Sequence, residues 1–175
     1  MSSVSVRDAR RSPSDRRWME GVYREYLNDL APAATGVFPT LGEFGHREPD
    51  QLGAWFADRR AQVLIILYGY EPVGFALVRT AAVPAGALPA TSELTMAEFF
   101  IARSWRRRGI GAEGARLILE RFTGRWEISA HRSNAGAVAF WRRVVASYAG
   151  GNAQERVLNG EVRLRFDSGS RRAPR

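Results

Sequence analysis

The 175-residue sequence contains no cysteine, no lysine and two histidines. The absence of cysteine excludes disulfides, thiolate catalysis, and zinc or iron–sulfur sites with sulfur ligands. His46 and His131 are too few for a histidine-rich metal site, so we predict that no metal is bound. The first residues lack the apolar core of a signal peptide, and no apolar run approaches the roughly 20 residues of a membrane span. The simplest interpretation is a soluble, cytoplasmic protein.

All 26 basic residues are arginines, and the formal net charge is +8. One explanation is codon bias in a GC-rich genome, and the other is a preference for anionic partners such as a phosphorylated cofactor or nucleic acid. Most arginines are spread along the chain, but Arg106–Arg108 and the tail Arg171–Arg175 are tight clusters. A nucleic-acid-binding module ranks low, because no basic face is interleaved with aromatic residues.

The length suits one domain, and the hydrophobic content of 45% suits a packed core. Periodicity and turn residues predict helices near 14–30 and 52–56, strands at 63–69, 73–81 and 93–102, a helix from 109, a strand at 126–130, a helix from 134, and strands at 155–159 and 161–166. Hairpins at both ends and strand–helix–strand units between them predict a single-domain α/β fold with a mixed sheet and helices on its faces. We expect residues 1–12 to be flexible, 13–168 to form the domain and 169–175 to be a basic tail.

The stretch WRRRGIGAEG joins the third strand to a helix. Such a turn presents unpaired backbone N–H groups, and the helix adds a partial positive charge, so it is suited to an anion. Gly109, Gly111 and Gly114 match G-x-G-x-x-G, which an ordinary turn can also match by chance. The dinucleotide interpretation requires a strand that runs straight into the first glycine and an acidic residue about 20 positions later, and both are missing.

Arg106, Gly109 and Gly111 also spell R-x-x-G-x-G. This strand, loop and helix resemble the acetyl-CoA motif of the GNAT N-acetyltransferase superfamily, whose loop is written Q/R-x-x-G-x-G/A. Downstream, the segment N-x-x-A-x-x-F-W, which begins at Asn134 and ends at Trp141, resembles the family helix pattern N-x-x-A-x-x-F/L-Y. The resemblance covers roughly residues 14–168 and is specific from about 93 to 145. Gly114 is then a small helix residue that allows close packing.

The resemblance implies a largely antiparallel sheet with helices on both faces and a central parallel strand pair, 94–102 and 126–131. The two strands splay apart and hold acetyl-CoA, the acyl-donor cosubstrate, and an N–H near Ile101 polarises its thioester carbonyl. The implied acetyl-CoA contacts are Phe100, Ile101, Arg106, Arg107, Arg108, Gly109, Ile110, Gly111, Ala112, Asn134 and Trp141.

Two glutamates are candidates for the base that deprotonates the acceptor amine. Glu98 lies in an apolar strand, where a lone carboxylate is costly unless it faces the cleft or a partner. Glu127 lies in WEISA with the same ambiguity and a weaker claim, and water could relay a proton to either. The alternative for both is a satisfied or edge-facing glutamate. We expect His131 to have a surface or structural role.

Trp141 stands where many family members have a tyrosine, and an indole cannot donate a proton near neutral pH. Either the thiolate leaves unassisted, or another residue such as Tyr148 serves, or the protein is a weak enzyme; Trp141 also fits an ordinary core position. The resemblance implies an N-acetyltransferase with a small-molecule or peptide amine acceptor, bound between the first helices and the late hairpin. A homodimer is a further possibility. The rival function is a non-catalytic acyl-CoA-binding or sensor protein of the same fold.

Overall fold

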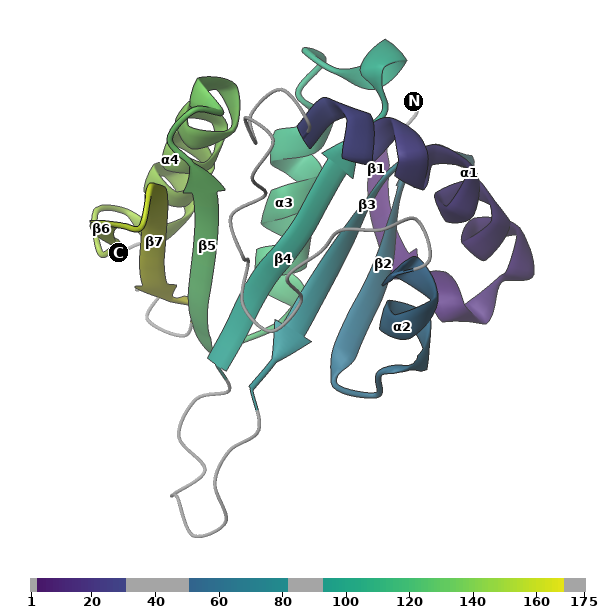
Figure 1. Ribbon diagram of the computed structural model, residues 1–175, viewed down its shortest axis with the longest axis horizontal. Helices are drawn as coiled ribbons and strands as arrows, with labels where there is room; N and C mark the ends of the chain where they lie inside the picture. Colours follow the sequence, from purple (N-terminus) through teal and green to yellow (C-terminus); the bar gives the residue numbers. More distant parts are fainter. Residues whose placement is uncertain (1–2, 31–50, 82–92, 169–175) are drawn as a thin grey trace, which may run out of the picture.

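The computed structural model describes residues 3–30, 51–81 and 93–168, which form a mixed sheet flanked by helices (Figure 1). The elements in chain order are β1 (Val4–Asp8), the short 3₁₀ helix η1 (Ala9–Arg11), α1 (Pro13–Leu30), α2 (Gln51–Ala57), β2 (Ala61–Tyr68), β3 (Glu71–Thr80), β4 (Glu93–Ile101), the 3₁₀ helix η3 (Arg103–Trp105), α3 (Ile110–Arg121), β5 (Arg125–His131), α4 (Ala135–Ala149), β6 (Gln154–Leu158) and β7 (Glu161–Asp167). The strand order is β1-β2-β3-β4-β5-β7-β6, and each neighbouring pair is antiparallel except β4 and β5. This confirms the predicted α/β fold with a mixed, largely antiparallel sheet.

The clearest boundary signals in the sequence act as predicted. The side chain of Asn134 accepts a hydrogen bond from the Ala137 N–H at 3.0 Å and so caps α4. Gly150 ends the same helix in the left-handed region. Asn159 and Gly160 have φ of 52° and 80°, the left-handed values of a tight hairpin turn, and they join β6 to β7. Within the described ranges, no helix is long and apolar enough to span a membrane.

The N-terminal segment differs from its prediction. Instead of being flexible throughout residues 1–12, the chain forms β1, which pairs antiparallel with β2. Val4 and Val6 pack against the core, and Arg7 donates two hydrogen bonds of 2.8 Å to the buried Asp15 carboxylate on α1. An alternation of five residues is too short to stand out in the sequence, so the predicted flexible segment is wrong here.

Each face of the sheet has a core of its own. Tyr23 and Phe75 belong to the core under α1 and α2, and Ile118 belongs to the core under α3 and α4 on the opposite face. At Gly114, a Cβ would lie 3.1 Å from the side chain of Ile66, so glycine lets α3 approach β2 closely. The expected packing role of Gly114 agrees with this contact.

The central parallel pair is joined along only part of its length. Pairing between β4 and β5 begins at Glu93 with Arg125 and ends at Met96 with Ile128. Both strands continue beyond these residues, and Figure 1 shows them diverging toward their C-terminal ends. The predicted splayed strand pair is therefore present, and its open end lies beside the start of α3.

Candidate functional site

The loop before α3 presents backbone N–H groups. Arg107 and Gly109 have φ of 63° and 78°, and the value at Arg107 is uncommon for a residue with a side chain. Gly109 precedes α3, and no side chain caps the helix there. The N–H groups of Ile110, Gly111 and Ala112 therefore lack intrahelical partners, and the helix dipole adds a partial positive charge. This end of α3 is suited to a phosphate group.

Arg106 connects the loop to α1. Its Nε donates to the Ile101 carbonyl at 2.6 Å, and its Nη2 donates to the Asp29 carboxylate. Arg103 donates to the other oxygen of Asp29 at 2.6 and 3.1 Å. Burial opposes ionisation of Asp29, but the hydrogen bonds from Arg106 and Arg103 outweigh it and hold the pKa of Asp29 below its usual value. The Arg106 side chain thus ties β4 and α1 together.

The other two arginines of the cluster are exposed. The Arg108 guanidinium carbon lies 5.1 Å from the centroid of the Trp105 ring. The Trp105 ring packs against the Tyr68 ring, with centroids 5.4 Å apart. Arg107 carries the left-handed turn of the loop. Arg107 and Arg108 therefore supply positive charge to the surface next to the N-terminus of α3.

Two backbone N–H groups of β4 point into the splay. The Ala102 N–H donates to the Val73 carbonyl of β3 at 2.9 Å. The hydrogen-bonding direction alternates along an antiparallel strand, so the Phe100 N–H also points to β3. The N–H groups of Phe99 and Ile101 point the opposite way, toward β5, beyond the last residues that pair with it. They are positioned to donate to a group held between the strands.

Aromatic rings line the splay on the α4 side. The Phe99 ring stacks with the Phe140 ring, with centroids 5.7 Å apart, and meets the Trp141 ring edge-on, with centroids 5.1 Å apart. Trp141 is 7% exposed, so it is a core residue at the place where the family pattern has tyrosine. A Cβ on Gly111 would lie 3.4 Å from Ile101 and 3.5 Å from Phe140. A larger side chain at Gly111 would therefore enter the space between α3, β4 and α4.

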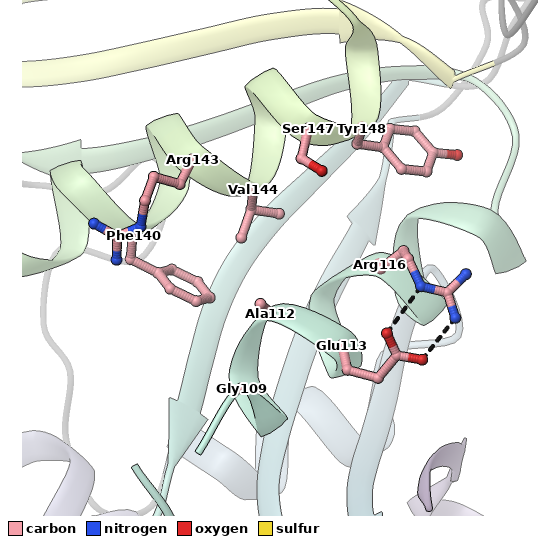
Figure 2. Close-up of a pocket in the computed structure, with 9 residues that line it drawn as sticks. All are labelled: Gly109, Ala112, Glu113, Arg116, Phe140, Arg143, Val144, Ser147 and Tyr148. Carbon is pink, nitrogen blue, oxygen red and sulfur yellow. Dashed lines mark hydrogen bonds and ion pairs between the residues drawn. The ribbon is translucent and has the colours of Figure 1, made fainter. Parts of the chain in front are cut away.

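A groove of about 460 Å³ runs between α3 and α4 (Figure 2). It is lined by Gly109, Ala112, Glu113, Arg116, Phe140, Arg143, Val144, Ser147 and Tyr148. Arg116 and Glu113 form an ion pair of 2.6 Å within it. The Tyr148 hydroxyl donates to the Leu119 carbonyl at 3.2 Å, near the C-terminal end of α3 and away from the splay. The groove thus continues outward from the loop along both helices.

This groove as a whole was not predicted from the sequence. Gly109 and the α3 residues of the groove follow the spacing i, i+3, i+4, i+7, and the α4 residues follow the same spacing from Phe140, with Tyr148 at i+8. Such a stripe marks one side of a helix. The matching stripes on the two helices were the available signal, and Arg143 is among the residues that they would have added.

A β-bulge sets the direction of Glu98. Val78 pairs with Met96 and Leu77 with Glu98, so Ala97 is an extra residue in β4. Leu77 belongs to the core under α1 and α2, and Glu98, directly opposite, shares that face of the sheet. Glu98 is 7% exposed, and burial raises its pKa well above the ordinary value. A carboxyl group that readily holds a proton therefore lies beside the splay.

The polar side chains of β5 on the same face bond to near neighbours. Glu127 accepts a 2.5 Å hydrogen bond from Arg165 and lies 3.7 Å from Arg163. His131 Nδ1 lies 2.6 Å from the Ser133 hydroxyl. The part of the chain that the structure describes contains no group of three or more His, Asp or Glu side chains arranged to hold a metal ion.

The structure brings most of the predicted donor-site residues together. Residues 106–112 surround the start of α3, and Ile101 and Trp141 lie at the splay. Phe100 differs, because its ring is 3% exposed in the core under α1 and α2, so only its backbone borders the splay. Asn134 uses its side-chain oxygen to cap α4.

Comparisons with known proteins agree with this geometry. The model of the acetyltransferase (GNAT) family matches residues 20–145. No curated protein matches the sequence. Among solved structures, a GNAT-family acetyltransferase from Streptococcus agalactiae is 15% identical, with 93% of each chain covered and a TM-score of 0.64.

Two further matches, among others, are complexes with a ligand. The PaiA N-acetyltransferase from Thermoplasma acidophilum, in complex with coenzyme A, is 12% identical, covers 94% of this chain and 99% of its own, and has a TM-score of 0.55. An aminoglycoside acetyltransferase from an uncultured soil metagenomic sample, in complex with sisomicin, is 12% identical, with 90% and 93% covered and a TM-score of 0.56. At these identities the likeness shows a shared fold.

Proposed function

The chain belongs to the acetyltransferase (GNAT) family, and from this premise we propose that it is an N-acetyltransferase that uses acetyl-CoA. The acceptor is an amine of a small molecule or peptide. The observation that carries the proposal is the splayed end of β4 and β5 directly beside the uncapped start of α3. That juxtaposition offers donors for a pyrophosphate and a space for a thioester within one site.

Acetyl-CoA fits the residues present. The N–H groups of Ile110, Gly111 and Ala112 suit its pyrophosphate, with Arg107 and Arg108 adding charge. The groove between α3 and α4 suits the more distant part of the molecule, and Arg143, exposed on α4, adds a cation for its remaining phosphate. The PaiA protein of the same fold was solved with coenzyme A, which supports this assignment.

The transfer is a direct attack of the amine on the thioester. The N–H of Ile101, aided by that of Phe99, donates to the thioester oxygen and stabilises its developing negative charge. The new C–N bond forms as the C–S bond breaks. Glu98 accepts the proton that the amine loses. Glu98 is preferred over Glu127, because the carboxylate of Glu127 is held by two arginines.

The departing thiolate takes its proton from solvent. Trp141 cannot supply one near neutral pH. Tyr148 donates its hydroxyl hydrogen to the Leu119 carbonyl and lies toward the far end of the groove. Unassisted departure is chemically reasonable, since thiols are far more acidic than alcohols or amines, as the free cysteine pKa of about 8.5 illustrates, and a thiolate is therefore a stable leaving group.

Replacing Gly111 tests the acetyl-CoA site. We expect Gly111→Leu to abolish acetyl-CoA binding in calorimetry, because the new side chain enters the space bounded by Ile101 and Phe140. The matched control is Gly21→Leu on α1, where a Cβ has nothing within 4 Å, and it should bind normally. Equal affinity in Gly111→Leu and wild type, with both folded by circular dichroism, would contradict the assignment.

A non-catalytic acyl-CoA sensor is the second candidate, favoured by Trp141 at the tyrosine position. The two functions separate in one measurement of CoA release with a panel of primary amines. Transfer to any amine supports the enzyme, and tight acetyl-CoA binding with no transfer supports the sensor. A cytoplasmic location and a homodimer stay predictions from the sequence.

A further inference from the structure

The hairpin of β6 and β7 carries arginines on the face of the sheet that bears Glu98. Val162 and Leu164 of β7 belong to the core under α3 and α4, so the alternate residues Arg163 and Arg165 face the opposite side. Arg156 of β6 is directly opposite Arg163 in the register and shares its face. We call Arg156, Arg163 and Arg165 the arginine platform.

The platform contains unused hydrogen-bonding capacity. Like charges directly opposite each other on neighbouring strands are destabilising, and Arg156 and Arg163 are such a pair. The Nε of Arg163 is buried and has no hydrogen-bond partner among the residues that the structure describes. Within the same ranges the Arg156 guanidinium forms no hydrogen bond or ion pair. A bound anion would relieve both costs.

Two glutamates neutralise part of the platform. Glu127 pairs with Arg165 and Arg163, and Glu161 pairs with Arg163 at 3.1 Å. Three arginines against two carboxylates leave one positive charge in excess. The excess charge belongs to Arg156, which is exposed at the edge of the sheet. The glutamates hold Arg163 and Arg165 in place, so the guanidinium donors are oriented before a ligand arrives.

The anion for this platform is not part of acetyl-CoA. The start of α3 and the groove between α3 and α4 lie on the other face of the sheet. Glu98 shares the face of the platform, as the register with Leu77 shows. We infer that the acceptor is an amine that also bears an oxyanion, carboxylate or phosphate, which the arginine platform binds while the amine faces Glu98. This inference rests on the proposed N-acetyltransferase function.

The register gives the size of such an acceptor. Arg163 is opposite Ser129 of β5, and β5 separates it from Glu98 on β4. Two strand spacings of about 4.8 Å place the backbones of Glu98 and Arg163 at least about 10 Å apart. Side chains on strands stand roughly perpendicular to the sheet, so the ends of Glu98 and Arg163 keep about this separation. Subtracting a hydrogen bond of about 3 Å at each end leaves about 4 Å or more between amine and oxyanion. Short ω-amino acids and aminoalkyl phosphates span this distance, and polyamines lack the anion.

Matched acceptor pairs test the inference. The panel is 4-aminobutyrate with 4-aminobutanamide, 6-aminohexanoate with 6-aminohexanamide, and O-phosphoethanolamine with ethanolamine, together with spermidine. CoA release at a fixed acetyl-CoA concentration gives kcat/KM for each. We expect the oxyanion member of at least one pair to exceed its neutral partner by at least about tenfold, as charge-assisted bonds to arginine predict. The winning pair distinguishes carboxylate from phosphate.

A variant then assigns the preference to the platform. Arg156→Ala should raise KM for the oxyanion acceptor by about tenfold and leave that of its neutral partner unchanged, because only the anion contacts Arg156. Arg156→Lys should retain part of the preference, since it keeps the charge but loses the planar fork. The matched control, Arg24→Ala, removes the same charge from an exposed position of α1 and should retain the full preference.

The outcomes separate the inference from the function on which it rests. Equal kcat/KM within every pair, or a preference for spermidine, would overturn the inference and leave the transferase intact. The same preference in Arg156→Ala as in Arg24→Ala would also overturn it. Failure of transfer to every member of this panel, with acetyl-CoA still bound, would overturn the inference. The transferase function itself is overturned only if the wider panel of primary amines, peptide amines included, also gives no CoA release.

Discussion

Glu98 and Glu127 lie on adjacent strands and on one face of the sheet, yet their surroundings differ. Glu98 is buried, and burial raises its pKa well above the ordinary value. Glu127 lies between Arg163 and Arg165. The sequence identified both glutamates as candidates but could not separate them, because the two arginines come from β7, which only the sheet topology places beside β5.

A substitution of Glu98 tests its role through the pH profile. If Glu98 is the base, kcat/KM rises with pH through its raised pKa. Glu98→Gln should lower kcat/KM by about 10²–10⁴-fold and flatten this rise, with acetyl-CoA affinity unchanged. Glu127→Gln is the control and should keep the rise. An unaltered profile in Glu98→Gln would refute the assignment.

The same substitution has a consequence for stability. The pKa of Glu98 is higher in the folded protein than in the unfolded chain, so the folded state binds the proton more tightly. The stability supplied by this bound proton is present at low pH and is lost as pH rises from the ordinary glutamate range through the raised value. Thermal melts across this window should show the decline in wild type and a smaller one in Glu98→Gln.

At the scale of elements, boundaries were predictable wherever local chemistry determines them. Asn134 and Gly150 delimit α4, and the pair Asn159-Gly160 sets the last hairpin. What escaped prediction depends on distant partners. β1 is stable because it pairs with β2 and because Arg7 forms a hydrogen-bonded ion pair with Asp15. The bulge that turns Glu98 to its face depends on the β3 register, which no local pattern encodes.

The junction of α1 with the loop before α3 gives a prediction at this scale. Asp29→Asn removes the charge that holds Arg103 and Arg106, so Arg106 should hold the Ile101 carbonyl less firmly. We expect kcat to fall more than KM for acetyl-CoA rises, as steady-state kinetics will show. Glu20→Gln, which breaks an exposed ion pair with Arg16 on the same helix, is the control. Parallel kinetics for the two variants would argue against a positioning role for Asp29.

The Asp29 junction also predicts acid sensitivity. The pKa of Asp29 is lower in the folded protein than in the unfolded chain. The stability from its two arginine partners is therefore complete above the ordinary aspartate pKa and is lost as pH falls through the lowered value. Asp29→Asn should show a smaller loss of melting temperature over this acidic range than wild type.

In the whole molecule, the two proposed binding sites lie on opposite faces of one sheet. The proposed donor site lies with α3 and α4, the proposed acceptor site lies on the face of α1 and α2, and the splay connects them. Composition and periodicity predicted the layers, and the resemblance predicted the splay. The arginine platform could not be predicted, because its three arginines are among those spread along the chain and only the strand register brings them together.

Removing the N-terminal strand tests the integrity of the whole sheet. A chain that lacks residues 1–8 loses the β1–β2 pairing and leaves Asp15, 3% exposed, without Arg7. We expect its melting temperature to fall by more than about 5 °C, since about 1 kcal/mol corresponds to about 2–4 °C at this size. Asp15→Asn should destabilise the full chain but partly rescue the shortened one, because it neutralises an unpaired buried charge. An unchanged melting temperature after truncation would show that β1 contributes nothing.

Asp29 belongs to α1, on the face of the proposed acceptor site, and it pairs with Arg103 and Arg106, which lie next to the proposed acetyl-CoA site. Thermodynamic reciprocity follows from such a shared residue. An acceptor that shifts the end of α1 changes the affinity for acetyl-CoA by some factor, and acetyl-CoA changes the affinity for that acceptor by the same factor. An acceptor screen on the free protein would then measure a different affinity from that of the CoA-bound protein. Such screens should therefore be run with the protein saturated with CoA.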